Sequence, residues 1–229
     1  VINKPTGIPV QSGTKSFKNI IDILKNSKYF KNSKPFIVHR LDKETSGILI
    51  IAKNRRYAQL FTSLFRIRKI HKTYLAIVYG KVDKSLKVMK DDLIYYENNK
   101  KFFQKAVSNI KIIKSNEGYS YLELNPITGR KHQLRKQLLK IGNPIIGDGK
   151  YGGSSQENLG DGWGAQFGGD ISKKLHLHAR YLKIEHPFEK KIIEIKADLP
   201  NHMARTWKTF QWDINLSLIH ISEPTRQAT

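Results

Sequence analysis

Residues 39–54, H-R-L-D-K-E-T-S-G-I-L-I-I-A-K-N, place a cluster of charged side chains directly before a run of apolar residues. The first six positions hold four charges, and residues 47–53 are typical of a buried strand. Asp42 stands between Arg40 and Lys43 at the edge of that strand. An ionised group is costly to desolvate there unless it is paired or takes part in chemistry. The stretch therefore predicts either a structural ion pair or a functional carboxylate.

The geometry expected around Asp42 leaves both interpretations open. We expect strands at residues 36–41 and 47–53, joined through the Thr-Ser-Gly of residues 45–47. Side chains alternate along a strand, so Arg40 and Asp42 would share one face, as in an ordinary surface ion pair. A two-carboxylate glycosidase site is another interpretation, because Asp42 and Glu44 would lie about 7 Å apart on a continuous strand. The Thr-Ser-Gly that follows disfavours it, because it suggests that the strand bends before Glu44 can align with Asp42.

The charge of the chain indicates a polyanionic partner. Its 229 residues contain 41 Lys and Arg against 19 Asp and Glu, a net charge of +22 with a pI near 10. Nucleic acid fits best, because the basic residues are spread through patterned segments that contain aromatic residues. No apolar run approaches 18 residues, so we expect no membrane partner. The absence of cysteine excludes disulfides, thiol catalysis and Cys-ligated zinc, and it is compatible with a reducing cytoplasm.

The remaining patterns predict an α+β fold in which antiparallel strands dominate. Asn54 is expected to cap a helix that ends near residue 68, and a second helix ends at Gly142. Further strands are expected at residues 71–82, 105–114, 119–125, 175–186 and 190–199, and a short helix carries Met203, Trp207 and Phe210. The Gly-rich residues 152–170 predict a mobile loop, with residues 160–170 as a candidate RNA contact.

Two further segments carry candidate functional side chains. Tyr74 shares a strand face with Ala76 and Val78, although most strand tyrosines only pack. In T-G-R-K-H-Q-L-R, residues 128–135, Arg130 and free backbone N–H groups predict a phosphate site at a helix start. His132, Arg135 and Leu139 would lie on one face of this helix; the alternative is a solvated basic helix.

A metal site is not expected from the histidine pair His176 and His178. The two alternate along one strand, but no third ligand occurs at a known spacing and the chain has no cysteine. We therefore interpret both as structural strand histidines.

Residues 39–47, H-R-L-D-K-E-T-S-G, closely resemble the H-R-L-D-x-x-T-S-G signature of the RluA-type pseudouridine synthases. Companion segments follow in the family's order: N-K-P-T-G-I-P-V, K-T-Y-L-A-I-V-Y-G, T-G-R-K-H-Q-L-R, G-D-G-K-Y-G-G and L-H-L-H-A-R-Y-L. The resemblance spans about residues 1–199 and is greatest to the branch that acts on large-subunit ribosomal RNA, while other members modify transfer RNA. It implies the pseudouridine synthase fold: a mixed, mostly antiparallel central sheet with helices and loops around an RNA-binding cleft.

The resemblance also assigns roles to residues. It implies that Asp42 is the nucleophile, that Arg135 is the cation paired with it, and that Tyr74 lies against the flipped uracil. Arg40 would fill the gap that the flipped base leaves in the RNA stack. The implied RNA-binding residues also include Lys4, Thr45, Gly47, Arg130, His132 and Gln133. The reaction is redox-neutral, so no cofactor and no metal are expected.

The expected organisation is a catalytic domain at residues 1–213 followed by an unstructured, non-native tail at residues 214–229. The chain opens on Val1 and has no S4-like domain such as many relatives carry, which suggests a truncated N-terminus. We expect a monomer in a bacterial cytoplasm or an organelle. The alternative function is a non-catalytic RNA-binding factor in ribosome assembly that retains the fold. The intact signature disfavours it, because binding alone does not require Asp42.

Overall fold

A computed structural model describes residues 1–12, 18–152 and 171–212 of the chain. The predicted tail and nearly all of the predicted Gly-rich loop lie outside these residues. None of the described helices is long and apolar enough to cross a membrane.

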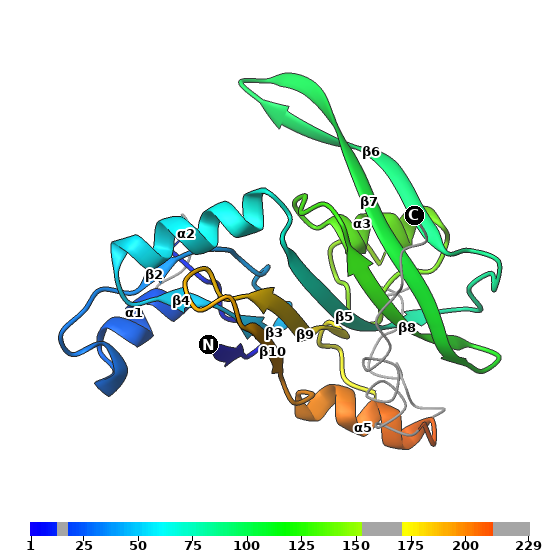
Figure 1. Ribbon diagram of the computed structural model, residues 1–229. Coiled ribbons are helices and arrows are strands. Elements are labelled where there is room, and N and C mark those ends of the chain that lie inside the picture. The colour runs from blue at the N-terminus through cyan, green and yellow to red at the C-terminus, as the bar shows by residue number, and fades with distance from the viewer. Residues whose placement is uncertain (13–17, 153–170, 213–229) are drawn as a thin grey trace.

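The centre of the molecule is a mixed, mostly antiparallel sheet, as the sequence predicts (Figure 1). Its strand order is β1-β3-β9-β5-β8-β7-β6. The remaining strand, β10, pairs with β9 on the same edge as β3. Among the described strands only β3 and β9 pair in parallel. The strands are β1 (Ile2–Lys4), β3 (Ser46–Leu49), β5 (Ile70–Tyr79), β6 (Val88–Glu97), β7 (Lys100–Ser115), β8 (Tyr119–Pro126), β9 (Leu177–Glu185) and β10 (Ile192–Lys196).

Helices cover both faces of the sheet around β5. Leu75 and Ile77 pack with Trp207 of α5, whereas Ala76 and Val78 pack with Leu138 of α3. Tyr74 packs against this second cluster, on the face that the sequence predicts. The described helices are α1 (Ile20–Lys25), the 3-10 helix η1 (Lys28–Phe30), α2 (Arg55–Arg66), α3 (Gln133–Lys140) and α5 (Asn201–Thr209). The alternation of β5 therefore places the phenol on the α3 side.

The predicted helix start at Asn54 is confirmed. The Asn54 side chain accepts a hydrogen bond of 3.0 Å from the backbone N–H of Tyr57, which satisfies one of the free donors at the N-terminus of α2. The apolar residues of α2 then pack on the sheet beside β9 and β10.

The predicted strand at residues 36–41 is confirmed only at its first two residues. Only β2 (Phe36–Ile37) forms, because its partner β4 (Ile51–Ala52) offers a ladder of two residues. The chain then runs without strand pairing through residues 38–45, so Arg40 and Asp42 lie on a loop. His39 holds this loop in place: its Nε2 accepts from the Ile50 N–H at 2.9 Å, and its ring stacks on Phe65. Burial lowers the pKa of His39 to about 3, which keeps the ring neutral and able to accept.

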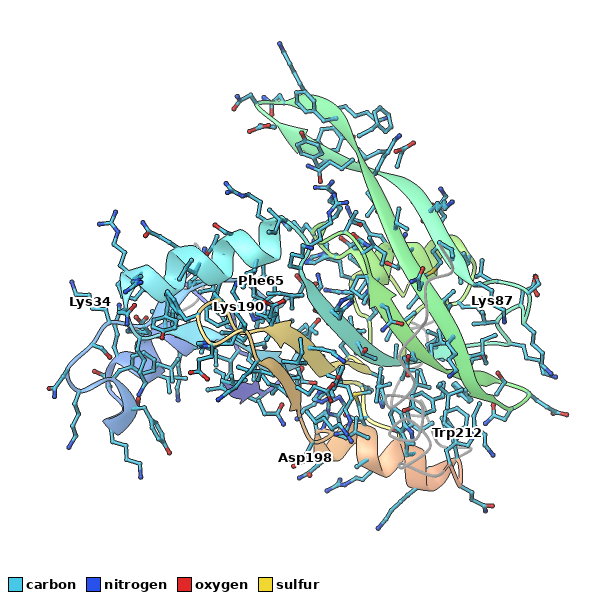
Figure 2. All side chains as sticks on the ribbon, viewed as in Figure 1. Lys34, Phe65, Lys87, Lys190, Asp198 and Trp212 are labelled. Atoms are coloured by element: carbon cyan, nitrogen blue, oxygen red, sulfur yellow. The ribbon has the colours of Figure 1, made fainter. Side chains whose placement is uncertain are left out.

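A long hairpin of β6 and β7 was not predicted in full. The sequence indicates a strand only at residues 105–114, whereas β7 begins at Lys100, and its residues 100–109 pair with the whole of β6. Asn98 and Asn99, with φ of 47° and 60°, form the turn between the strands. The outer part of the hairpin projects beyond the rest of the sheet, with side chains in solvent on both faces (Figure 2). With no buried face, alternation of apolar and polar residues is absent there.

Candidate active site

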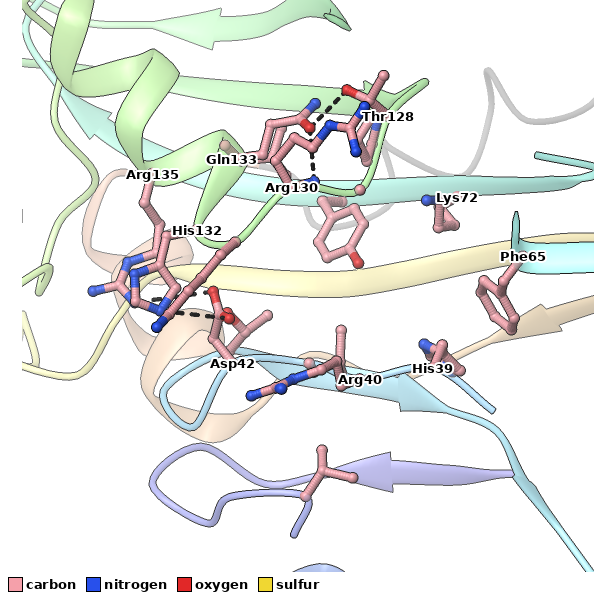
Figure 3. A pocket seen from close by; sticks show the side chains of 18 of the residues that line it. His39, Arg40, Asp42, Phe65, Lys72, Thr128, Arg130, His132, Gln133 and Arg135 are labelled. Atoms are coloured by element: carbon pink, nitrogen blue, oxygen red, sulfur yellow. Dashed lines mark hydrogen bonds and ion pairs between the residues drawn. The ribbon is translucent and has the colours of Figure 1, made fainter. Parts of the chain in front are cut away.

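A pocket of about 930 Å³ opens between the loop at residues 38–45, the end of α2, β5, and residues 126–135 (Figure 3). Nine cationic side chains line it, and Asp42 is the one carboxylate among the described residues of the lining. The cations are Arg40, Lys43, Arg66, Arg68, Lys72, Arg130, Lys131, Arg135 and Lys150. A concave surface with this charge distribution concentrates a polyanion near one carboxylate.

Asp42 is held on its loop by backbone contacts. The Thr45 N–H donates to the Asp42 carbonyl at 3.1 Å and closes a turn directly after the residue. Its side chain remains one quarter exposed and faces the pocket. The loop is therefore held by its backbone, while the carboxylate is accessible to a ligand.

The Thr-Ser-Gly that follows attaches this loop to β9. The Ser46 hydroxyl hydrogen-bonds with Nδ1 of His178 at 2.9 Å, and Gly47 pairs with Ala179 in the parallel ladder. Gly47 has φ of +112°, and a Cβ atom built on it would lie 2.3 Å from the Ala179 carbonyl oxygen. Gly47 is outside the pocket lining, so the structure gives it a role in strand packing, in place of the predicted RNA contact.

Arg135 approaches Asp42 but makes its hydrogen bonds with another carboxylate. Its Nη1 lies 4.0 Å from Asp42 Oδ2, while Nε and Nη2 donate to Asp148 at 2.8 and 2.6 Å. The predicted partners thus form an ion pair without a hydrogen bond between them. Burial lowers the pKa of Arg135, but the hydrogen bonds and charge of Asp148, with Asp42, outweigh burial and raise it. Sequence reasoning missed Asp148, although it lies within the quoted G-D-G-K-Y-G-G segment.

His132 is the second group that faces Asp42. Its Nε2 lies 3.6 Å from Asp42 Oδ1, and its Nδ1 is hydrogen-bonded with the Tyr151 hydroxyl at 2.8 Å. Its backbone is left-handed, with φ of 54°, and precedes α3 directly. Burial lowers the pKa of His132 and the Asp42 charge opposes this, so the ring is neutral near pH 7. Of the three residues predicted to share one helix face, His132 and Arg135 both line the pocket. The third, Leu139, is exposed and lies outside the lining.

Tyr74 lines the same pocket from β5. Burial raises the pKa of its phenol, and the negative charge of Asp42 adds to this effect. The phenol is therefore protonated at neutral pH, and it lies close enough to Asp42 for the carboxylate charge to affect its pKa. A protonated phenol donates a hydrogen bond.

Lys4 does not face the pocket, contrary to the predicted RNA contact. Its side chain is fully buried, and Nζ donates to the carbonyls of Pro5, Ile8 and Lys43 at 2.7–3.0 Å. These bonds use all three donors of the ammonium. Burial lowers the pKa of Lys4 to about 8, against the opposing charges of Glu44 and Asp42. Lys4 thus fastens the start of the chain to the loop that carries Asp42.

Gln133 and Arg130 shape the opposite wall of the pocket. The Gln133 amide accepts from Thr128 and the Arg130 N–H, and donates to Val107 and Ser108, which leaves little capacity for the predicted RNA contact. Arg130 is half-buried and donates to the Lys105 carbonyl. It lines the pocket from the segment before α3, which begins at Gln133.

The histidines His176 and His178 are structural, as the sequence predicts. His176 is hydrogen-bonded with Lys174 and Thr206, and His178 with Ser46 and Ala197. Burial lowers the pKa of both, to about 3 and about 4, so both are neutral. No group of three potential ligands gathers within the described residues.

Comparison with known proteins identifies similar sequences. A family model described as RNA pseudouridylate synthase matches residues 1–140. The ribosomal large subunit pseudouridine synthase C of Rickettsia felis is 35% identical over 87% of this chain and 64% of its own length. The tRNA pseudouridine synthase C of Haemophilus ducreyi is 33% identical over 92% of this chain and 91% of its own length. RNA pseudouridine synthase 4, mitochondrial, of Arabidopsis thaliana is 34% identical over 80% of this chain and 49% of its own length.

A solved structure agrees with this result. The human protein titled RNA Pseudouridylate Synthase Domain Containing 4 superposes with a TM-score of 0.74 at 28% identity, covering 93% of this chain and 89% of that one. The chain spans less than two thirds of the length of the Rickettsia felis and Arabidopsis relatives.

Proposed function

Because the chain belongs to the RNA pseudouridylate synthase family, we propose that it isomerises uridine to pseudouridine in RNA. One observation carries this proposal: among the described residues of the pocket lining, Asp42 is the one carboxylate beside nine cations, and it lies close to Arg135, His132 and Tyr74. The cations suit a phosphate backbone, and the pocket has room for an extruded base. A binding surface alone has no need for a carboxylate at its centre.

The reaction breaks the bond between N1 of uracil and C1′ of ribose and forms a bond between C5 and C1′. The C5 proton leaves and N1 gains a proton, so neither oxidant nor reductant is needed. We propose that Asp42 is the nucleophile, attacking the sugar or the base. The positive charge of Arg135 lies 4.0 Å from the carboxylate, and the turn closed by Thr45 holds the loop that carries Asp42 beside the pocket.

The proposed substrate is large-subunit ribosomal RNA, because the Rickettsia felis relative is named for that subunit. The Haemophilus ducreyi relative is named for transfer RNA, which makes transfer RNA the second substrate to test. Reverse-transcription mapping after carbodiimide treatment, on RNA from cells with and without this protein, distinguishes them.

That the chain acts as a monomer stays a prediction, which size-exclusion chromatography with light scattering checks.

Release of tritium from RNA labelled at uridine C5 tests the activity itself. The proposed isomerase releases the label with multiple turnovers, because the C5 proton is lost in every cycle. An assembly factor that only binds RNA releases none. Binding without tritium release or new pseudouridine, across both RNA classes, would reject the proposed function.

We propose that the Tyr74 phenol lies against the flipped uracil and takes part in removal of the C5 proton, and Tyr74→Phe tests this role. We expect kcat to fall by about 100-fold or more, because Phe keeps the stacking plane but lacks the hydroxyl that takes part in proton transfer. Binding of RNA should stay within about twofold. The control is Tyr57→Phe on α2, whose ring packs outside the pocket. A wild-type rate in the Tyr74 variant would limit this residue to stacking.

Arg40→Ala tests the proposed gap-filling role. Arg40 is exposed on the rim beside Asp42 (Figure 3). A planar guanidinium stacks on bases, so its loss should weaken capture of a uridine within a duplex about tenfold more than capture of an unpaired uridine. Arg66→Ala removes the same charge from the pocket lining and should weaken both substrates equally. Equal losses in the Arg40 variant would contradict the stacking role.

A further inference from the structure

We propose that Asp148 is a positioning residue that holds Arg135 away from direct contact with Asp42, so that the carboxylate stays free to react. The inference rests on the proposed function. Asp148 lies outside the pocket lining and acts only through its neighbours.

The first support is the geometry of the buried pair. Arg135 and Asp148 are 5% and 1% exposed, and two parallel hydrogen bonds join them through Nε and Nη2. This fork is the strongest arrangement that a guanidinium forms with a carboxylate. Only Nη1 is directed at Asp42, at 4.0 Å, which is beyond hydrogen-bond distance. Arg135 therefore supplies charge to Asp42 without tying up its lone pairs.

The second support is that Asp148 also orients the imidazole on the other side of Asp42. Asp148 Oδ1 accepts from the backbone N–H groups of Lys150 and Tyr151, which fixes the turn that carries Tyr151. The Tyr151 hydroxyl is hydrogen-bonded with His132, whose Nε2 faces Asp42. The Arg135 guanidinium lies over the Tyr151 ring at 5.1 Å. One buried carboxylate thus anchors both groups that face the proposed nucleophile from this side.

A physical argument explains why this matters for the reaction. A carboxylate held in a two-hydrogen-bond pair with arginine has its lone pairs engaged, and attack on carbon requires breaking those bonds. If Asp148 loses its charge, Asp42 becomes the nearest carboxylate for a buried guanidinium. We expect Arg135 to turn and pair with Asp42 directly.

The test is Asp148→Asn in the full chain. Asn keeps an oxygen for the N–H groups of the turn, but its amide nitrogen cannot accept from Arg135. We expect kcat to fall by about 10- to 100-fold, because a small displacement of groups around the nucleophile has effects of this size. KM for RNA should stay within about twofold.

A second readout separates positioning from a merely structural role. The charged and titratable groups that interact electrostatically with Asp42 are Arg135, His132, Tyr74, Tyr151 and the buried Lys4, which does not face the pocket. A closer Arg135 stabilises the ionised form of Asp42, so the acidic limb of the kcat profile should move to lower pH. A structural role lowers the folded fraction but leaves the pH profile of the folded enzyme unchanged. The crystal structure of the variant should show Arg135 within about 3 Å of Asp42.

Asp91→Asn is the matched control. Asp91 accepts from Gln137 and Lys140 on the same helix as Arg135, but it lies outside the pocket lining. This variant should keep the wild-type kcat and pH profile even if it is less stable. If the wild type releases tritium and Asp148→Asn keeps kcat, pH profile and Arg135 position, the inference is overturned while the proposed function stands. If the wild type itself is inactive on every RNA, the proposed function fails, and the inference fails with it.

Discussion

Asp42→Asn is expected to release no measurable tritium from RNA labelled at uridine C5, a loss of at least about 1,000-fold in kcat. The amide has nearly the same shape as the carboxylate, so the turn closed by the Thr45 N–H onto the Asp42 carbonyl is retained. It is uncharged and a poor nucleophile, so the step that breaks the glycosidic bond has no attacking group. The nine cations that line the pocket remain. RNA affinity should therefore stay equal to or above the wild-type value.

Two measurements on the same protein make this result decisive. Filter binding of RNA across a range of salt concentrations should give the wild-type slope, because no phosphate contact is lost. Thermal unfolding should show no loss of stability, since the substitution only replaces the Asp42 carboxylate, which is one quarter exposed and lies near Arg135, by a neutral group. Turnover at the wild-type rate would exclude Asp42 as the nucleophile. A loss of binding that parallels the loss of rate would instead indicate a role in recognition.

Gly47→Ala is expected to destabilise the fold by about 3–5 kcal/mol, which corresponds to roughly 10 °C in the unfolding temperature. Gly47 has φ of +112°, a region that residues with a Cβ rarely adopt, and the added methyl would lie 2.3 Å from the Ala179 carbonyl oxygen and 2.6 Å from the Ala179 nitrogen. Both contacts are with backbone, so relief requires that β3 and β9 separate. β3 and the preceding loop, which carries Asp42, would shift together. Loss of activity should therefore accompany loss of stability.

Gly118→Ala is the control for this effect. Gly118 lies in the turn between β7 and β8, its φ is outside the left-handed region, and an added Cβ meets no atom within 4 Å. Its variant should change the free energy of unfolding by less than about 1 kcal/mol. Denaturant unfolding of both variants, monitored by Trp fluorescence, checks the difference. A Gly47 variant as stable as the Gly118 variant would contradict the close approach of β3 and β9.

Local sequence patterns predicted the elements that have a buried face. The helix that begins after Asn54, the strand that carries Tyr74 and the helix that ends before Gly142 follow from caps and apolar spacing. The loop that carries Asp42 and the strand β6 were not predicted correctly, for opposite reasons. The apolar residues before His39 resemble a strand but find only a two-residue partner. The outer part of β6 lacks alternation, because both of its faces are in solvent, and it is a strand only through its pairing with β7.

The candidate site shows the same division. The sequence by itself determined the candidate functional residues, because the signature around Asp42 and the segments of Tyr74 and Arg135 are each contiguous in the chain. Only the tertiary structure decided which of them touch. It shows that Asp148, 13 residues beyond Arg135, takes both parallel hydrogen bonds of that guanidinium, and that Lys4 and Gly47 fasten the loop in place of lining the pocket. Such choices depend on distances between distant segments and on competition for buried donors and acceptors, which local patterns do not encode.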